Sequence, residues 1–220
     1  MFENTKAIFF DLDGTLVDSM NLWRKIDEQF LIEKKINIDP EVLQQDIAGL
    51  SMTQTAQYFR DTFNTEETCE ELMESWHNQA FNWYRDKAEL KPGAKSFIEM
   101  LNMYGFKTAI VSSNSRLLVE TFVNSTGIDS FIDVIITTNE VERSKPFPDA
   151  YLLAASTVGV DPKNCLVFED IVEGIQAGNA AGMRTCAIWD DFSAYQWEDK
   201  KKEADYFVYT YKEAADLIIG

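Results

Sequence analysis

The sequence predicts an α/β fold, a doubly wound parallel sheet whose chain is interrupted by an all-helical domain. Over residues 90–220, short apolar runs alternate with helical segments, a pattern that forms parallel sheets with helices on both faces. Between the first apolar run and this region, about 70 residues show helical periodicity and no convincing strand. We therefore expect a core domain of residues 1–16 and 90–220 and an inserted helical domain of residues 17–89.

The first strand is expected at residues 7–10, where alanine, isoleucine and two phenylalanines form a run typical of a buried strand. Asp11 and Asp13 follow directly, and residues two apart in a strand project to the same side. Two carboxylates at a buried strand end are costly unless something compensates their charge. A hard divalent cation such as Mg²⁺ would do so. The alternative at this point is a polar turn that only closes the strand.

The inserted domain is predicted to contain four helices rich in aromatic residues. Each begins after a capping residue or a proline. The start signals are Asp18-Ser19, Pro40, Ser51 or Thr53, and the segment 65–68. The chain crosses between the two domains at residues 15–19 and 88–92, where we expect hinges.

After residues 92–93, Pro-Gly, the chain returns to the core and the alternating pattern begins. Strands are expected at residues 107–112, 134–137, 165–168, 185–189 and 205–209. Helices are expected at residues 94–104, 116–125, 149–158, 171–182 and 212–219. In sheets of this kind a ligand lies beyond the carboxyl ends of the strands. The side chains that follow each strand are therefore the candidates for a binding site.

Polar side chains follow four of the expected strands, either directly or in the next loop. They are Asp11 and Asp13, then Ser112, Ser113 and Asn114, then Lys145, then Glu169 and Asp170. All of them should face one crevice. Carboxylates, hydroxyls, an amide and a lysine suit a phosphoryl group bound together with Mg²⁺, because the metal and the lysine offset negative charge and the other groups supply hydrogen bonds.

Each part of this set also has a structural alternative. Ser112 and Ser113 suit the cap of the following helix, and a lone lysine such as Lys145 is commonly a solvated surface residue. Asp170 with Glu173 suits a capping box. Glycine recurs at positions 174, 178 and 182, a spacing typical of a helix face packed closely on a sheet. The four parts nevertheless arrive in order, each after its own strand, and this agreement favours a common site.

Composition limits the classes of partner. The 220 residues carry a formal net charge of −17, which argues against nucleic acid and against an anionic membrane surface as partners. Three cysteines without a CxxC spacing predict a reduced, cytoplasmic protein. No apolar run indicates a membrane span or a secretion signal. The single histidine, His77, excludes a site built from several histidines.

Together these motifs resemble the haloacid dehalogenase superfamily, in its branch with a helical cap that includes β-phosphoglucomutase and phosphoglycolate phosphatase. The family's first motif, DxDGT followed by Leu or Val, matches residues 11–16 in full, and its second falls on Ser112. The lysine motif falls on residues 145–149, KPFPD, and the acidic motif on Glu169-Asp170 with Gly174 downstream. The resemblance spans essentially the whole chain. It implies a Rossmann-like core with residues 17–89 in the place of the cap.

The resemblance also implies roles for the residues at the strand ends. Asp11 would be the nucleophile that forms an aspartyl-phosphate, and Asp13 would be the general acid and base. Mg²⁺ would bind the Asp11 and Asp170 carboxylates and the Asp13 backbone carbonyl, with Glu169 at or just behind these ligands. The phosphoryl oxygens would contact Ser112 and Lys145, with Ser113 and Asn114 as further candidates.

The expected activity is therefore Mg²⁺-dependent hydrolysis of a small phosphorylated metabolite, and the length of the chain suits a monomer. A sugar-phosphate mutase is the alternative within the family. In β-phosphoglucomutase a histidine lies in the first cap helix and an arginine follows the cap's glycine turn. Trp23 and Met52 take these places here and weaken that alternative; with Met20 they line an apolar cap surface or belong to the cap core. A receiver-like module that accepts and holds phosphate is a third hypothesis, but such modules lack the helical insertion.

Overall fold

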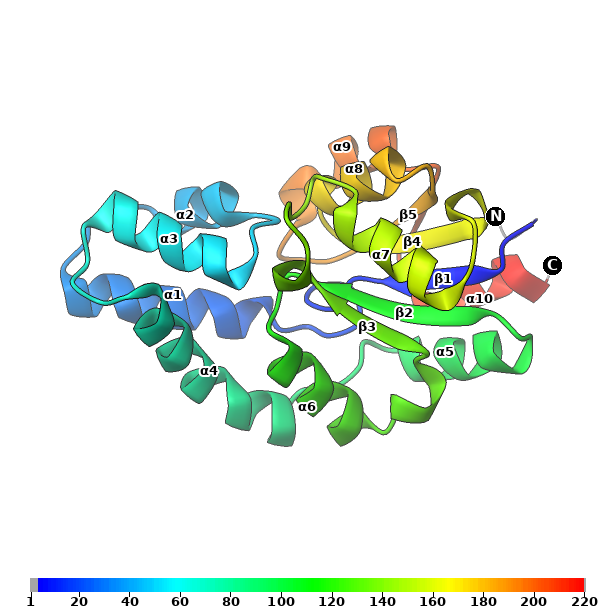
Figure 1. The fold of residues 1–220 in the computed structure, drawn as a ribbon, viewed down its shortest axis with the longest axis horizontal. Coiled ribbons are helices and arrows are strands. Elements are labelled where there is room, and N and C mark those ends of the chain that lie inside the picture. The colour runs from blue at the N-terminus through cyan, green and yellow to red at the C-terminus, as the bar shows by residue number, and fades with distance from the viewer. Residues whose placement is uncertain (1–3, 220) are drawn as a thin grey trace.

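A six-stranded parallel sheet forms the core of the structure, a computed structural model that describes residues 4–219. The strands are β1 (Ala7–Phe10), β2 (Lys107–Ser112), β3 (Val134–Thr137), β4 (Cys165–Glu169), β5 (Arg184–Ile188) and β6 (Tyr206–Val208). Their order is β3-β2-β1-β4-β5-β6, so β1 lies in the middle, paired with β2 and β4. The predicted doubly wound α/β fold is confirmed, and all six strands lie where the sequence places them (Figure 1).

The alternation of side chains along β1 divides the core into two layers. Ile8 and Phe10 pack in one cluster with α5 (Ala94–Met103), α6 (Arg116–Thr126) and α10 (Tyr211–Ile219). Ala7 and Phe9 pack on the opposite face with α7 (Asp149–Val158) and α8 (Val172–Ala180). Figure 1 shows these two groups of helices on opposite sides of the sheet. β1 is fully buried on both faces, and the buried Asp11 follows directly at its carboxyl end.

Four helices form the inserted cap. They are α1 (Met20–Lys34), α2 (Pro40–Ile47), α3 (Met52–Phe63) and α4 (Cys69–Asp86). Ser51 and Thr68 each complete a capping box, with Gln54 and Glu71 respectively. The cap has an aromatic interior in which Phe59 contacts Phe30, Phe63 and Trp76 at ring-centroid distances of 5.0–5.4 Å. The inserted segment is thus helical, as predicted. Its boundaries at residues 17 and 89 stay a prediction.

Two of the structural alternatives are wrong, and the expected close packing of the glycine face holds for two of its three glycines. The cap of α6 is Ser115, not Ser112 or Ser113. Helix α8 begins after Ile171 without a side-chain cap, so Asp170 and Glu173 form no capping box. Gly182 lies beyond α8 in a left-handed turn with a φ of 75°, whereas Gly174 and Gly178 do pack closely on the sheet side. A further helix, α9 (Trp197–Glu203), was not expected from the sequence.

The two crossings between core and cap lie side by side. Val17 forms an isolated antiparallel bridge with Leu90, and the Lys91 backbone N–H donates to the carbonyl of Leu16 at 2.8 Å. The Lys91 ammonium also bonds the carbonyl of Gly14 and, at 2.7 Å, the carboxylate of Asp190. Among residues 4–219, no helix combines the length and apolar character that crossing a bilayer requires.

Candidate active site

The neighbouring carboxyl ends of β1 and β4 bring three predicted site residues together. One carboxylate oxygen each of Asp11, Glu169 and Asp170 lies within 4.8 Å of the others, and all three side chains are buried. Burial raises the pKa of Asp11 well above its ordinary value; Lys145 opposes this shift, and Glu169 and Asp170 add to it. Burial, followed by the charges of Asp190 and Glu169, raises the pKa of Asp170 to about 7. The site therefore concentrates negative charge that a cation would stabilise.

Lys145 supplies part of the compensating charge. Its ammonium lies 2.5 Å from Asp11 Oδ1 and 2.5 Å from Glu169 Oε1. Burial alone would lower the pKa of Lys145, but the charges of Asp11 and Glu169 outweigh that effect and raise the pKa above its ordinary value. The lysine is 4% exposed, so the alternative of a solvated surface lysine is wrong. Tyr151 of α7 donates to the same Glu169 oxygen at 2.6 Å and helps to fix this carboxylate.

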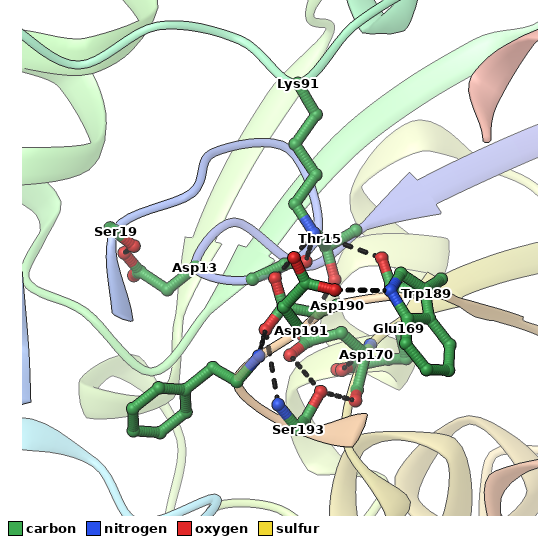
Figure 2. Close-up of polar contacts among 12 residues, drawn as sticks. Asp13, Thr15, Ser19, Lys91, Glu169, Asp170, Trp189, Asp190, Asp191 and Ser193 are labelled. Carbon is green, nitrogen blue, oxygen red and sulfur yellow. Dashed lines mark hydrogen bonds and ion pairs between the residues drawn. The ribbon is translucent and has the colours of Figure 1, made fainter. Parts of the chain in front are cut away.

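Asp170 is oriented by residues from two loops and from helix α9. Thr15 donates to its Oδ1 at 2.9 Å, and Ser193 donates to its carbonyl at 2.8 Å and faces its Oδ2 at 3.3 Å. The fully buried Lys200 of α9 donates to the same carbonyl at 2.7 Å. Figure 2 shows Thr15, Ser193 and the Lys91–Asp190 pair around Asp170. The helix missed by the sequence analysis thus holds the backbone of a predicted metal ligand.

Two glycines allow the carboxylates to approach the backbone. A Cβ on Gly14 would lie 2.2 Å from Asp170 Oδ2, and its φ of 84° is unfavourable for other residues. A Cβ on Gly174 would lie 2.0 Å from the Glu169 carboxylate. Gly174 therefore belongs to the acidic motif for a steric reason, because only hydrogen leaves room for the carboxylate beneath α8.

Asp13 is held by side chains from both domains. Its Oδ1 accepts hydrogen bonds from Ser19, from Trp23 Nε1 at 3.3 Å and from the hydroxyl of Tyr84. Its Oδ2 accepts from Asn114 Nδ2 at 3.1 Å. Figure 2 shows the side chain directed toward Ser19 and away from the Glu169–Asp170 pair. Asp13 therefore stands apart from the cluster of three carboxylates and in contact with the cap.

Sequence reasoning missed Tyr84, and it gave Trp23 only as cap surface or cap core, not as a partner of Asp13. Tyr84 is fully buried on α4, and its hydroxyl also accepts from Trp23 Nε1 at 3.0 Å and from Asn114 Nδ2 at 3.1 Å. Burial, and then the charge of Asp13, raise the pKa of this phenol well above its ordinary value, so it stays protonated and can donate. The sequence signal for Trp23 was its place in the first cap helix, whereas Tyr84 looked like any other apolar residue of α4.

The remaining predicted residues line the same cavity. Its volume is about 180 Å³, and its walls include Asp11, Asp13, Ser112, Ser113, Asn114, Lys145 and Asp170. Ser112 is buried, and its Oγ accepts from the backbone N–H of Asn114 at 3.0 Å. Met20, Trp23 and Met52 of the cap line this cavity too. The structure thus brings all the predicted site residues together: all but Glu169 line the cavity, and Glu169 belongs to the cluster of three carboxylates and contacts Lys145.

The sequence as a whole matches a known protein family. The model of the haloacid dehalogenase-like hydrolase family matches residues 8–188, which include every predicted site residue and the whole cap. The chain belongs to the haloacid dehalogenase-like hydrolase family. The resemblance drawn from the motifs is therefore confirmed, as is the expectation of an enzyme of this type.

Individual members of the family match over most of the chain. Hexitol phosphatase A of Escherichia coli is 31% identical over 183 residues, which are 83% of this chain and 82% of that protein. The structure of CbbY from Rhodobacter sphaeroides in complex with phosphate has a TM-score of 0.81 at 20% identity, covering 94% of this chain and 95% of that chain. β-Phosphoglucomutase from Clostridium difficile has a TM-score of 0.77 at 23% identity, covering 95% and 92%. At these identities the two structures show a shared fold.

Some relatives are longer than this chain. The chain spans 48% and 18% of the length of two Arabidopsis thaliana proteins that it also matches. Its similarity to those proteins therefore concerns one part of each of them.

Proposed function

We propose that this protein is a Mg²⁺-dependent phosphatase that hydrolyses a small phosphorylated metabolite through an aspartyl-phosphate on Asp11. The observation that carries the proposal is the placement of the Asp11 carboxylate. It lies buried at the end of β1, with Oδ1 held by Lys145 at 2.5 Å and with Asp170 and Glu169 beside it. A nucleophile held in one orientation in the wall of a cavity is suited to attack on a bound phosphoryl group.

The two carboxylates of the first motif would take different parts in two balanced steps. In the first, an oxygen of Asp11 attacks phosphorus, the bond from phosphorus to the ester oxygen breaks, and Asp13 gives its proton to the leaving oxygen. In the second, Asp13 takes a proton from water, the water oxygen attacks phosphorus, and the bond to Asp11 breaks to release inorganic phosphate. Contact with Ser19, Trp23 and Tyr84 would keep Asp13 from approaching Asp11 and becoming a second nucleophile.

The donor set fits a magnesium ion. Three buried carboxylates meet within 4.8 Å, and oxygen ligands of this kind are those that Mg²⁺ prefers. Asp11, Asp170 and the backbone carbonyl of Asp13 would hold the ion. Glu169 would stand behind them, since its Oε1 receives Lys145 and Tyr151 and its Oε2 accepts the backbone N–H of Asp170. When bound, the ion would offset the charge of the phosphoryl group.

Ser112, Ser113 and Lys145 would contact the phosphoryl oxygens from the side of β2 and of the loop before α7. Asn114 would serve mainly Asp13, because its amide group already donates to that carboxylate and to Tyr84. Several curated relatives are named phosphatases, hexitol phosphatase A among them, which supports the reaction class. Among the described residues that line the cavity, Lys145 is the cation; a mutase must hold two phosphates, so this lining favours hydrolysis.

The test is repeated turnover of p-nitrophenyl phosphate by the full chain, with Mg²⁺ and with excess EDTA. We expect many turnovers per protein with Mg²⁺, loss of activity in EDTA, and recovery on adding Mg²⁺ back. A single stoichiometric release of nitrophenol would instead indicate a module that accepts phosphate and holds it. Metal-independent turnover, or none, would contradict the proposal.

We further propose the domain limits 1–16 with 90–220 and 17–89, hinges at the two crossings, and action as a monomer in the cytoplasm. The free thiols of Cys69, Cys165 and Cys186 support a reducing compartment. Size-exclusion chromatography with light scattering would test the oligomeric state, and a mass of twice the chain would contradict it.

A further inference from the structure

One face of α1 points into the cavity that holds the reacting carboxylates. Met20, Trp23 and Asp27 line this cavity, and their spacing of three and four residues places them on one side of a helix. Trp23 touches Asp13. Asp27 lies one turn further along α1, roughly 6 Å from Trp23 along the helix axis. Asp27 is therefore placed where the part of a substrate furthest from its phosphate would lie.

Asp27 is an unusual residue for this wall of the cavity. It is 7% exposed, and Gln44 of α2, which also lines the cavity, donates a hydrogen bond to its Oδ2. Burial raises the pKa of Asp27 to about 7; Gln44 opposes the shift, and Glu28 adds to it. No other hydrogen bond to Asp27 arises among residues 4–219, so a carboxylate oxygen is left to accept a bond from a ligand. A buried carboxylate with one partner is costly unless a further group completes its hydrogen bonding.

The surroundings of this pair are apolar. Ile47, Met52 and Trp76 of the cap line the same cavity. The Lys145 ammonium, the cation among the described lining residues, is occupied by Asp11 and Glu169. Hydroxyl groups can satisfy Asp27 and Gln44 while carbon atoms contact the apolar wall. A carboxylate or a second phosphate would meet the Asp27 carboxylate without a cation to offset it.

We propose that Asp27 and Gln44 select the substrate, by accepting and donating hydrogen bonds to a hydroxyl group of an uncharged, polyhydroxylated leaving group such as a sugar or sugar alcohol. The inference rests on the proposed phosphatase activity and adds the substrate class. The cavity volume of about 180 Å³ lies below the roughly 300 Å³ at which pockets for drug-sized ligands begin, which favours a small leaving group.

The test compares two substrates of equal chain length in one enzyme preparation. Sorbitol 6-phosphate carries hydroxyl groups along a six-carbon chain, and hexyl phosphate carries none. The ratio of their kcat/KM values does not depend on the fraction of folded enzyme. We expect the ratio to favour sorbitol 6-phosphate in the wild type and to fall about tenfold or more in Asp27→Leu. Asp61→Asn, a change at an exposed cap carboxylate that bonds Gln57, serves as the control and should keep the wild-type ratio.

A second comparison tests the exclusion of anions. The compound 6-phosphogluconate matches sorbitol 6-phosphate in length but ends in a carboxylate. At pH 8, where Asp27 is ionised, we expect the wild type to prefer sorbitol 6-phosphate and Asp27→Asn, which removes the charge at nearly constant shape, to reduce that preference severalfold.

The outcomes distinguish a failure of the phosphatase proposal from a failure of the proposal that Asp27 selects the substrate. If the wild type does not turn over p-nitrophenyl phosphate, the phosphatase proposal fails. If the wild type turns it over but Asp27→Leu keeps the wild-type ratio of sorbitol 6-phosphate to hexyl phosphate, the phosphatase stands and Asp27 has no part in selection. A wild-type preference for hexyl phosphate or for 6-phosphogluconate would equally overturn the inference.

Discussion

In the core, the polar side chains of the site follow the ends of β1, β2 and β4, whereas in the cap they project from the faces of α1, α2 and α4. Strand ends are fixed by backbone pairing, and a buried carboxylate there is surrounded by other backbone and side-chain groups. A helix face can change one residue at a time without disturbing its neighbours' hydrogen bonds. The difference supports the proposal that the core carries out the reaction and the cap selects the substrate. The predictions below test that division.

The largest effect is expected at the core nucleophile. Asp11→Asn keeps the shape of the side chain but removes the charge that attacks phosphorus, so kcat should fall roughly 10⁴-fold or more. Steady-state turnover of p-nitrophenyl phosphate measures the loss, with Asp61→Asn as the control of unchanged activity. A loss smaller than about tenfold would mean that another group performs the attack.

The next effect tests how tightly the core packs its carboxylates. Gly174→Ala should lower the free energy of unfolding by about 3 kcal/mol and disturb Glu169, because the new Cβ would lie 2.0 Å from that carboxylate. Helix propensity alone would favour alanine by about 1 kcal/mol, so a destabilisation must come from the clash. Urea denaturation measures it. Gly105→Ala is the control: its φ is 79° and nothing lies within 4 Å, so only backbone strain is expected.

A third effect concerns the buried carboxylate of the cap. The pKa of Asp27 is about 7 in the folded protein and about 3.9 when unfolded. Between these values the folded state binds more protons, so wild-type stability falls as the pH rises. Relative to Asp27→Asn, we expect the wild type to lose roughly 2 kcal/mol between pH 5 and pH 7. Paired denaturation curves at the two pH values measure the difference; a difference that stays constant with pH would contradict the burial argument.

The smallest effect falls where the two domains meet. Tyr84→Phe removes one hydroxyl from Asp13 and leaves the ring packing intact, so we expect kcat to fall about tenfold with little change in thermal stability. Tyr58→Phe, which removes a cap hydroxyl bonded to Asp46 at 2.7 Å, is the matched control and should leave kcat unchanged. Equal effects of the two variants would show that the hydroxyl of Tyr84 acts only through the stability of the cap.

The same division explains how much the sequence predicts. Every strand was predicted, and so was the meeting of Asp11, Lys145 and Asp170, because parallel strands end at the same edge of a sheet. Helix α9 was missed because its seven residues carry three lysines in succession and one large apolar anchor, Trp197, too few for a periodic pattern. Its buried Lys200 looks like a surface residue until Asp170 and Ser193 are seen to receive its hydrogen bonds.

The contacts that cap residues make with the core could not be predicted from the sequence, for a different reason. Periodicity places Trp23, Asp27 and Tyr84 on helices, but which side of each helix meets the core depends on packing between segments distant in sequence. Tyr84 lies 71 residues from the carboxylate it contacts. A motif of adjacent residues therefore cannot encode such a contact, and the sequence carries no local sign of it.

The paired crossings of Val17 with Leu90 and Leu16 with Lys91 have a consequence for how such enzymes diversify. The chain leaves the core and re-enters it at adjacent points, so the inserted segment closes a loop whose ends are already joined by backbone hydrogen bonds. An insert of another length or composition can start and finish at the same two points without moving β1 or α5. Recombination at this junction can therefore replace one cap domain by another while the core domain keeps its strands and its carboxylates.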